Sequence, residues 1–234
     1  MKEVLQIMAH HLFPVYVKFT TRVNEQNEIK RGFLQQFQFP NVVGAIDCTH
    51  IAIVAPPEND PHHLGDAYLN RKGFYSINVH VICDSDLKIL GANARYPGST
   101  HDSAIWSMSS INRCMRRNFE RGDHTSWLLG DSGYALKLWL LTAIPDALDG
   151  SPGARYTLML CRARNVIERY FGVLKQRFHC LLKHRVSHYN HAPRALIFNS
   201  CWVLQNICIG RNLVNYEDAE EFENEEDDQE MNDI

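Results

Sequence analysis

Hydrophobic residues are spaced in two different ways along the chain, and the spacing changes from one segment to the next. Apolar and β-branched residues dominate 42–54 and 126–131, and they alternate with polar residues over 75–84 and 87–98. Runs of this kind predict strands. Because the short turn 84–86 joins two of these runs, a hairpin is expected there.

Helical spacing predominates in the rest of the chain. Five apolar residues recur at steps of four and three, so they lie on one face of a helix predicted over 162–182. They are Ile167, Phe171, Leu174, Phe178 and Leu181. Further helices are predicted at 1–12, 26–37, 102–117, 134–144 and 192–212, with loops at 55–72 and 146–157.

The order of these elements indicates an α/β protein of the mixed α+β type, in which helices pack on a mixed five-stranded sheet. Three acidic residues are distributed over it in a particular way. Asp47 lies on the first strand, Asp131 follows the fourth, and Glu168 lies on the next helix. This arrangement is typical of the ribonuclease-H-like fold, which is therefore the predicted architecture.

Charge is distributed unevenly, although the net charge is only −3. Residues 215–234 contain 11 Asp and Glu and no Lys or Arg, so the remaining 24 basic and 16 acidic residues give 1–214 a charge of about +8. A basic body with an acidic end suggests a domain that binds a polyanion. We divide the chain into a remnant of an N-terminal helical region (1–40), a main domain (41–212) and an acidic disordered tail (213–234).

Cysteine content and hydropathy restrict the classes of protein to which the chain can belong. The chain has seven cysteines, an odd number, and no C-x-x-C pair. A disulfide framework is therefore not expected, and a reducing compartment is. No run approaches the 18 apolar residues of a membrane span, and the first 20 residues lack the features of a signal peptide.

The three acidic residues suggest a metal site. Taken singly, Asp47 and Asp131 are explained as turn or cap residues, and Glu168 as a partner in a helical ion pair. Taken together, they are the hard oxygen ligands that Mg²⁺ prefers. Two such ions roughly 3.5–4 Å apart can activate water and stabilise the leaving oxygen of a phosphodiester.

Basic residues are concentrated on the same predicted helix, where they are expected to neutralise phosphates next to the metal. The candidates for nucleic-acid binding are Arg162, Arg164, Arg169, Lys175 and Arg177. Two tyrosines, Tyr134 and Tyr170, are candidates for stacking on bases, with packing in the core as the alternative.

Several motifs in the same order resemble the nuclease domain of PIF/Harbinger transposases, a DDE superfamily endonuclease domain with domesticated relatives in animals. They are GAIDCTHIAI, NRKGFYSINVHVICD, ARYPGSTHDSAIW, WLLGDSGY and NVIERYFGVLKQRF, and they span roughly 40–210. Because five motifs recur in order, the likeness is far more specific than any one of them.

The resemblance implies a function and its residues. Asp47, Asp131 and Glu168 are implied as the catalytic D-D-E triad of a DNA endonuclease, with Asp102 as a fourth candidate ligand for Mg²⁺ or Mn²⁺. For Asp102 a role as a first-turn acid or N-cap is an equal alternative. A Myb-like DNA-binding partner protein and a location in nucleus and cytoplasm are also implied.

The chain departs from the family pattern at two places. Only about 40 residues precede Asp47, where family members usually carry a helix-turn-helix region, so target recognition by the chain itself is not expected. Leu160 stands where the family has a His, which affects the expectation for substrate handling near 156–162.

Three other functions compete with the nuclease. An HD-type phosphohydrolase would use His50, His101-Asp102 and Asp131, but such enzymes place their ligands on helices. A zinc site would draw on His179, Cys180, His184, His188 and His191, without a second cysteine at zinc-finger spacing. The third is a domesticated, catalytically silent transposase that binds DNA or protein. Metal binding by the carboxylates distinguishes the nuclease from the silent module.

Overall fold

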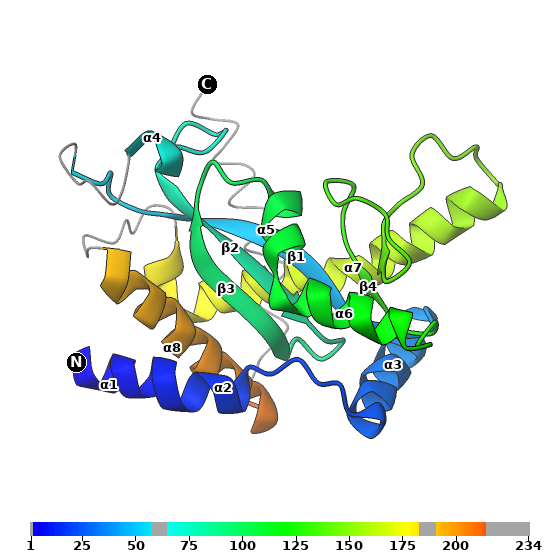
Figure 1. Cartoon of the computed structure of the whole chain (residues 1–234), viewed down its shortest axis with the longest axis horizontal. Coiled ribbons are helices and arrows are strands. Elements are labelled where there is room, and N and C mark those ends of the chain that lie inside the picture. Colours follow the sequence, from blue (N-terminus) through cyan, green and yellow to red (C-terminus); the bar gives the residue numbers. More distant parts are fainter. Residues whose placement is uncertain (1, 58–64, 183–190, 214–234) are drawn as a thin grey trace.

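The computed structural model of the chain describes residues 2–57, 65–182 and 191–213, and its centre is a sheet of five strands (Figure 1). The strands occur in the spatial order β3-β2-β1-β4-β5. β1 pairs antiparallel with β2, and β2 with β3, whereas β4 is parallel to both β1 and β5. The mixed sheet is confirmed. Its strands are β1 (Val42–Ala52), β2 (Ser76–Cys83), β3 (Ile89–Pro97), β4 (Trp127–Leu129) and β5 (Leu140–Leu141).

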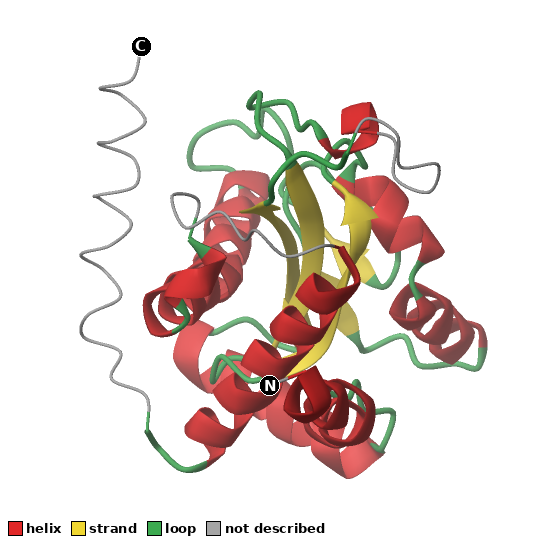
Figure 2. Ribbon diagram, turned by 90° about the vertical axis from the view of Figure 1, so that its left-hand side faces the viewer, coloured by secondary structure: helices red, strands yellow, loops and turns green. Residues whose placement is uncertain are grey.

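Helices cover both faces of this sheet (Figure 2). The N-terminal ones are α1 (Lys2–Ile7), the π-helix η1 (Met8–Leu12), α2 (Phe13–Tyr16) and α3 (Val23–Phe37). The others are α4 (Gly65–Tyr68), α5 (Asp102–Met108), α6 (Ser110–Glu120), α7 (Pro152–Arg177), the 3-10 helix η2 (His179–Leu181) and α8 (His191–Gly210). Within the described part of the chain, no helix is long and apolar enough to cross a membrane.

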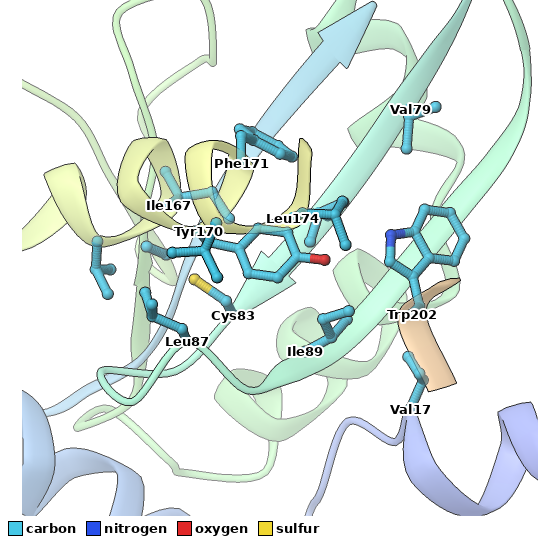
Figure 3. Close-up of a cluster of buried hydrophobic side chains, with 14 of the residues drawn as sticks. Val17, Val79, Cys83, Leu87, Ile89, Ile167, Tyr170, Phe171, Leu174 and Trp202 are labelled. Carbon is cyan, nitrogen blue, oxygen red and sulfur yellow. The ribbon is translucent and has the colours of Figure 1, made fainter. Parts of the chain in front are cut away.

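The alternation of side chains along the strands creates two hydrophobic cores. Ala45 of β1 belongs to the core under α7 and α8, whereas the next residue, Ile46, belongs to the core under α5 and α6. Tyr170 of α7 and Trp202 of α8 are buried in the first of them, against the strands (Figure 3). The sheet is therefore a middle layer, and α7 is fixed over β1, the strand that carries Asp47.

The N-terminal helices pack on the first core. Trp202 of α8 lies 6.0 Å from Phe13 of α2, measured between ring centroids. Asn206 donates to the carbonyl of Tyr16 at 2.8 Å, and its carboxamide also binds both the N–H and the carbonyl of Ile89 on β3. One buried side chain thus joins three elements. The division of the chain at residue 40 stays a prediction.

Most predicted elements are present, and several predictions are wrong in detail. The helix predicted over 162–182 ends at Arg177 and is followed by a separate 3-10 turn, and the loop predicted over 55–72 contains the short helix α4. The helix predicted over 102–117 is two helices, because Ser109 ends α5 and caps α6 by accepting from the N–H of Asn112 at 3.0 Å. The segment 134–144 is not a helix, since it contains the two-residue strand β5, which pairs with β4. The loop predicted over 146–157 ends early, because Ser151 caps α7.

Candidate active site

Asp47 lies in the middle of β1, not at a strand end as predicted, and Asp131 comes directly after the short neighbouring parallel strand β4. Ala45 of β1 is paired with Leu129 of β4, and each aspartate comes two residues after its member of that pair. β4 ends here whereas β1 continues to Ala52, and the register places the two aspartates at the same level of the sheet. This is the juxtaposition that the order of elements predicts.

A tight turn after β4 orients Asp131. Its Oδ1 accepts from the N–H of Gly133 at 3.0 Å. A Cβ at position 133 would lie 3.2 Å from the same oxygen, so a side chain there would push against the carboxylate. The Asp-Ser-Gly sequence thus acts as a turn and places a half-buried carboxylate at the sheet edge at the same time.

Arg164 joins the strand to the helix by bridging two of the predicted ligands. Its Nη1 lies 3.2 Å from Oδ2 of Asp47, and its Nη2 is paired with Oε1 of Glu168, one turn further along α7. The width of one guanidinium and two hydrogen bonds keeps the two carboxylates within roughly 8 Å of each other. Glu168 therefore faces Asp47 across Arg164 and does not point away from the sheet.

Asp102, the fourth candidate, is held at the first turn of α5. Its Oδ1 accepts from Nδ2 of Asn78 on β2 at 2.7 Å, and the same amide donates to the carbonyl of Thr100 at 2.8 Å. Next to it, Sγ of Cys48 lies 3.5 Å from the hydroxyl of Tyr134. Burial raises the pKa of the Cys48 thiol and of the Tyr134 phenol, so this pair beside the aspartates is uncharged.

The electrostatics of Asp47 reflect this crowding. Its pKa is raised to about 7, chiefly by burial and to a smaller extent by the negative charges of Asp131 and Asp102. The N–H of Cys48 and the guanidinium of Arg164 act in the opposite direction and do not compensate. Crowded carboxylates are expected to behave in this way without a cation. An added positive charge would stabilise the ionised form of Asp47.

The oxygen donors and the negative charges of the candidate carboxylates suit a hard divalent cation. Carboxylate oxygens are the usual ligands of Mg²⁺ and Mn²⁺. In the described parts of the chain, however, no three His, Cys, Asp or Glu side chains form a group arranged to hold an ion. The guanidinium of Arg164 lies where Asp47 and Glu168 would share one. The donor chemistry therefore fits a divalent cation, while in this arrangement the guanidinium of Arg164 is bound to two of the carboxylates.

The competing sites find less support. His50 lies on β1, as predicted, and Asp131 lies in a turn, so two of the ligands of an HD-type phosphohydrolase would not come from helices. For the zinc site, His184 and His188 lie outside the described residues. Tyr134 and Tyr170 are only 3% and 0% exposed, so core packing explains both, and neither is available to stack on a base.

Of the predicted basic residues of α7, Arg164 contacts two of the carboxylates, and two others lie on a different side of the helix. Arg162 and Arg169 are exposed and lie on one stripe of the helix. At about 3.6 residues per turn this stripe is roughly 130° around the axis from Arg164 and Glu168. Arg177 donates to the carbonyl of Leu213 at 2.8 Å. Their role in nucleic-acid binding stays a prediction, as does that of Lys175, which is half-buried.

Two other basic residues lie beside the site, and the sequence reasoning missed them. Arg71 and Lys72 are exposed on a turn that Asn70 builds by accepting from the N–H of Lys72 at 2.9 Å. Burial is the main cause that lowers the pKa of His50. The positive charges of Arg71 and Lys72 lower this pKa further, whereas the negative charge of Asp102 raises it. Arg71, Lys72 and Asp102 are thus close to the same imidazole. The available signal was the Asn-Arg-Lys-Gly turn motif before β2.

Comparisons with known proteins show the family to which the chain belongs. Residues 46–206 match the family model described as DDE superfamily endonuclease. The Homo sapiens protein named "Putative nuclease HARBI1" is 33% identical over 201 residues, which are 85% of this chain and 54% of that protein. The Rattus norvegicus protein of the same name is 36% identical over 188 residues, or 79% of this chain and 51% of that protein.

A more distant relative is "Protein ALP1-like" of Arabidopsis thaliana, with 25% identity over 198 residues, which are 78% of this chain and 47% of that protein. The chain spans about half the length of the curated relatives it matches. No solved structure matches it. The family model covers more than half of the chain and contains all four candidate acids, and the chain therefore belongs to the DDE superfamily endonucleases.

Proposed function

We propose that this protein is a divalent-metal-dependent nuclease, derived from a transposase, that hydrolyses phosphodiester bonds in DNA by a two-metal mechanism. The observation that supports this most strongly is the meeting of three carboxylates from distant parts of the chain. Asp47 on β1 and Asp131 after β4 lie at the same level of two neighbouring parallel strands, and Glu168 is joined to Asp47 through Arg164. If the ion pair of Arg164 with Asp47 had only a structural role, it would not require Asp131 beside Asp47.

In this proposal Asp47, Asp131 and Glu168 hold Mg²⁺ or Mn²⁺, and Asp102 contributes from the other side of Cys48. When bound, the ions supply an activated water and stabilise the departing oxygen. The protein's own part is to fix the carboxylates on rigid elements: a central strand, a strand-end turn and a long buried helix. Asp47 itself is only 17% exposed, and the attraction between a carboxylate and a cation is stronger where little water screens it.

The second candidate function is a catalytically silent DNA- or protein-binding module. One observation favours it: Arg164 already neutralises Asp47 and Glu168 without a metal. A Myb-like partner protein and a location in nucleus and cytoplasm are part of the proposal for either function. The acidic segment 214–234 lies outside the described residues.

Nicking of duplex DNA tests the choice between the two functions. Purified protein is expected to convert supercoiled plasmid to the nicked form in Mn²⁺, and Glu168→Gln is expected to reduce the rate by about 10²-fold or more, because the amide is a poor ligand. Glu120→Gln is the matched control, since Glu120 also pairs with an arginine one turn away, but on exposed α6. Nicking at equal rates by all three proteins would show that Glu168 is not a ligand.

The turn beside the site is expected to contact the DNA backbone. The double substitution Arg71→Gln with Lys72→Gln should lower the slope of log affinity against log salt by about 1.8, or roughly 0.9 for each lost phosphate contact. Arg162→Gln with Arg169→Gln removes the same charge from the stripe on α7. A filter-binding salt titration compares the two. If only the second pair lowers the slope, DNA lies on α7 and not over the turn at 70–73.

A further inference from the structure

Arg164 does not behave like an ordinary surface arginine. Its side chain is only 16% exposed, and it is shared between Asp47, which is 17% exposed, and Glu168, which is 44% exposed. Burial works against the charge of a guanidinium, yet the two carboxylates raise the pKa of Arg164 above its ordinary value. The arginine is therefore a cation held inside the group of proposed metal ligands.

The contacts of Arg164 compete with a metal for particular atoms. Its guanidinium is bound to Oδ2 of Asp47 and to Oε1 of Glu168. A divalent ion shared by these two carboxylates would need oxygens from both and would lie within a few ångströms of a fixed positive charge. Like charges at that distance repel strongly where little water screens them. Metal binding and the Arg164 bridge therefore exclude each other.

A DNA phosphate offers the guanidinium an alternative partner. Phosphate, like carboxylate, accepts two parallel hydrogen bonds from arginine. Glu168 is the more exposed of the two partners, so Arg164 can be released on that side while it stays anchored on α7. The same backbone phosphate that is to be cleaved must approach this edge of the sheet.

We propose that Arg164 is a positioning residue that closes Asp47 and Glu168 to divalent cations until a DNA phosphate takes over its guanidinium. This inference rests on the proposed function, because it presupposes that the carboxylates are metal ligands. It makes metal loading depend on substrate. Because linkage is reciprocal, bound DNA should tighten Mn²⁺ binding and Mn²⁺ should tighten DNA binding by the same factor.

Calorimetric titration with Mn²⁺ tests the proposal without relying on cleavage. The wild type, Arg164→Gln and Arg164→Lys are titrated alone and with a short DNA duplex at low temperature, and a gel verifies that the duplex stays intact. Arg116→Gln is the matched control, because it breaks an exposed Arg–Glu pair of the same spacing on α6. Asp131→Asn reports whether the bound Mn²⁺ is at the proposed site.

The expected result has two parts. Without DNA, Arg164→Gln binds Mn²⁺ on the order of tenfold more tightly than the wild type and Arg116→Gln, a factor typical of coupling between sites. In the presence of the duplex, the Mn²⁺ affinity of the wild type increases, whereas the Mn²⁺ affinity of Arg164→Gln does not change. Arg164→Lys, which keeps the charge but not the two-sided bridge, lies between them. Thermal unfolding of each variant, measured first, confirms that it is folded.

Other results overturn the inference in distinguishable ways. If Asp131→Asn abolishes Mn²⁺ binding while the wild type and Arg164→Gln bind equally well, the metal site exists and Arg164 does not close it. Weaker binding by Arg164→Gln means that Arg164 orders the ligands and does not block them. If Asp131→Asn binds Mn²⁺ as well as every other protein, the proposed metal site fails, and the inference with it. If Arg164→Gln does not fold, the same comparisons apply to Arg164→Lys.

Discussion

Replacing Asp47 by Asn should abolish metal-dependent DNA cleavage while the protein remains at least as stable as the wild type. The amide is uncharged and a poorer ligand, so the rate is expected to fall by about 10³-fold or more, which corresponds to several kcal/mol in the barrier. Stability should not fall in parallel, because burial and the neighbouring aspartates make the ionised form of Asp47 costly in the folded state. Active sites commonly trade stability for function in this way.

The two effects of Asp47→Asn are measured separately, by plasmid nicking in Mn²⁺ and by thermal unfolding. Asp149→Asn is the control, since it makes the same chemical change in an exposed loop. Asp131→Asn should lose cleavage as Asp47→Asn does. Calorimetry that finds equal Mn²⁺ affinity in the wild type and in both site variants would contradict the assignment of these residues as ligands. A large loss of stability in Asp47→Asn would show that the carboxylate holds the fold together.

The largest loss of stability is expected from Trp202→Ala. Trp202 is 1% exposed, and its ring lies 6.0 Å from that of Phe13 and 6.5 Å from that of Phe198. Truncation removes the contact between α8 and the N-terminal helices and leaves a cavity in the first core. Substitutions of this kind typically cost about 3–5 kcal/mol in the free energy of unfolding.

Urea denaturation measures this difference. Leu204→Ala is the matched control on the same helix, because Leu204 is 40% exposed and should cost less than about 1 kcal/mol. If both variants unfold at the same urea concentration, the N-terminal helices do not depend on Trp202. A loss that appears only as fraying of the first 20 residues would show that they are a separate unit, in line with the predicted boundary at residue 40.

The layered fold could be predicted because its signals are local. The alternation over 75–84 and the apolar face of 162–182 depend on residues a few positions apart, and β2 and α7 form there. The neighbourhood of Asp47 and Asp131 followed from the order of elements. β5 was missed because two residues carry no periodicity, and Leu140–Leu141 becomes a strand only where β4 offers it an edge.

The detailed site was decided by contacts between residues far apart in sequence. The i,i+4 spacing allows the pair of Arg164 with Glu168, but only the packing of α7 over β1 brings Arg164 to Asp47, 117 residues away. The spatial order of the strands and the turn before β2 bring Arg71 and Lys72 near His50 and Asp102. The sequence by itself determined which acids lie on the first strand, after the fourth strand and on the long helix, although Asp47 lies within β1 and not at its end. The tertiary structure decided which charges face them, because charges meet through space and not along the chain.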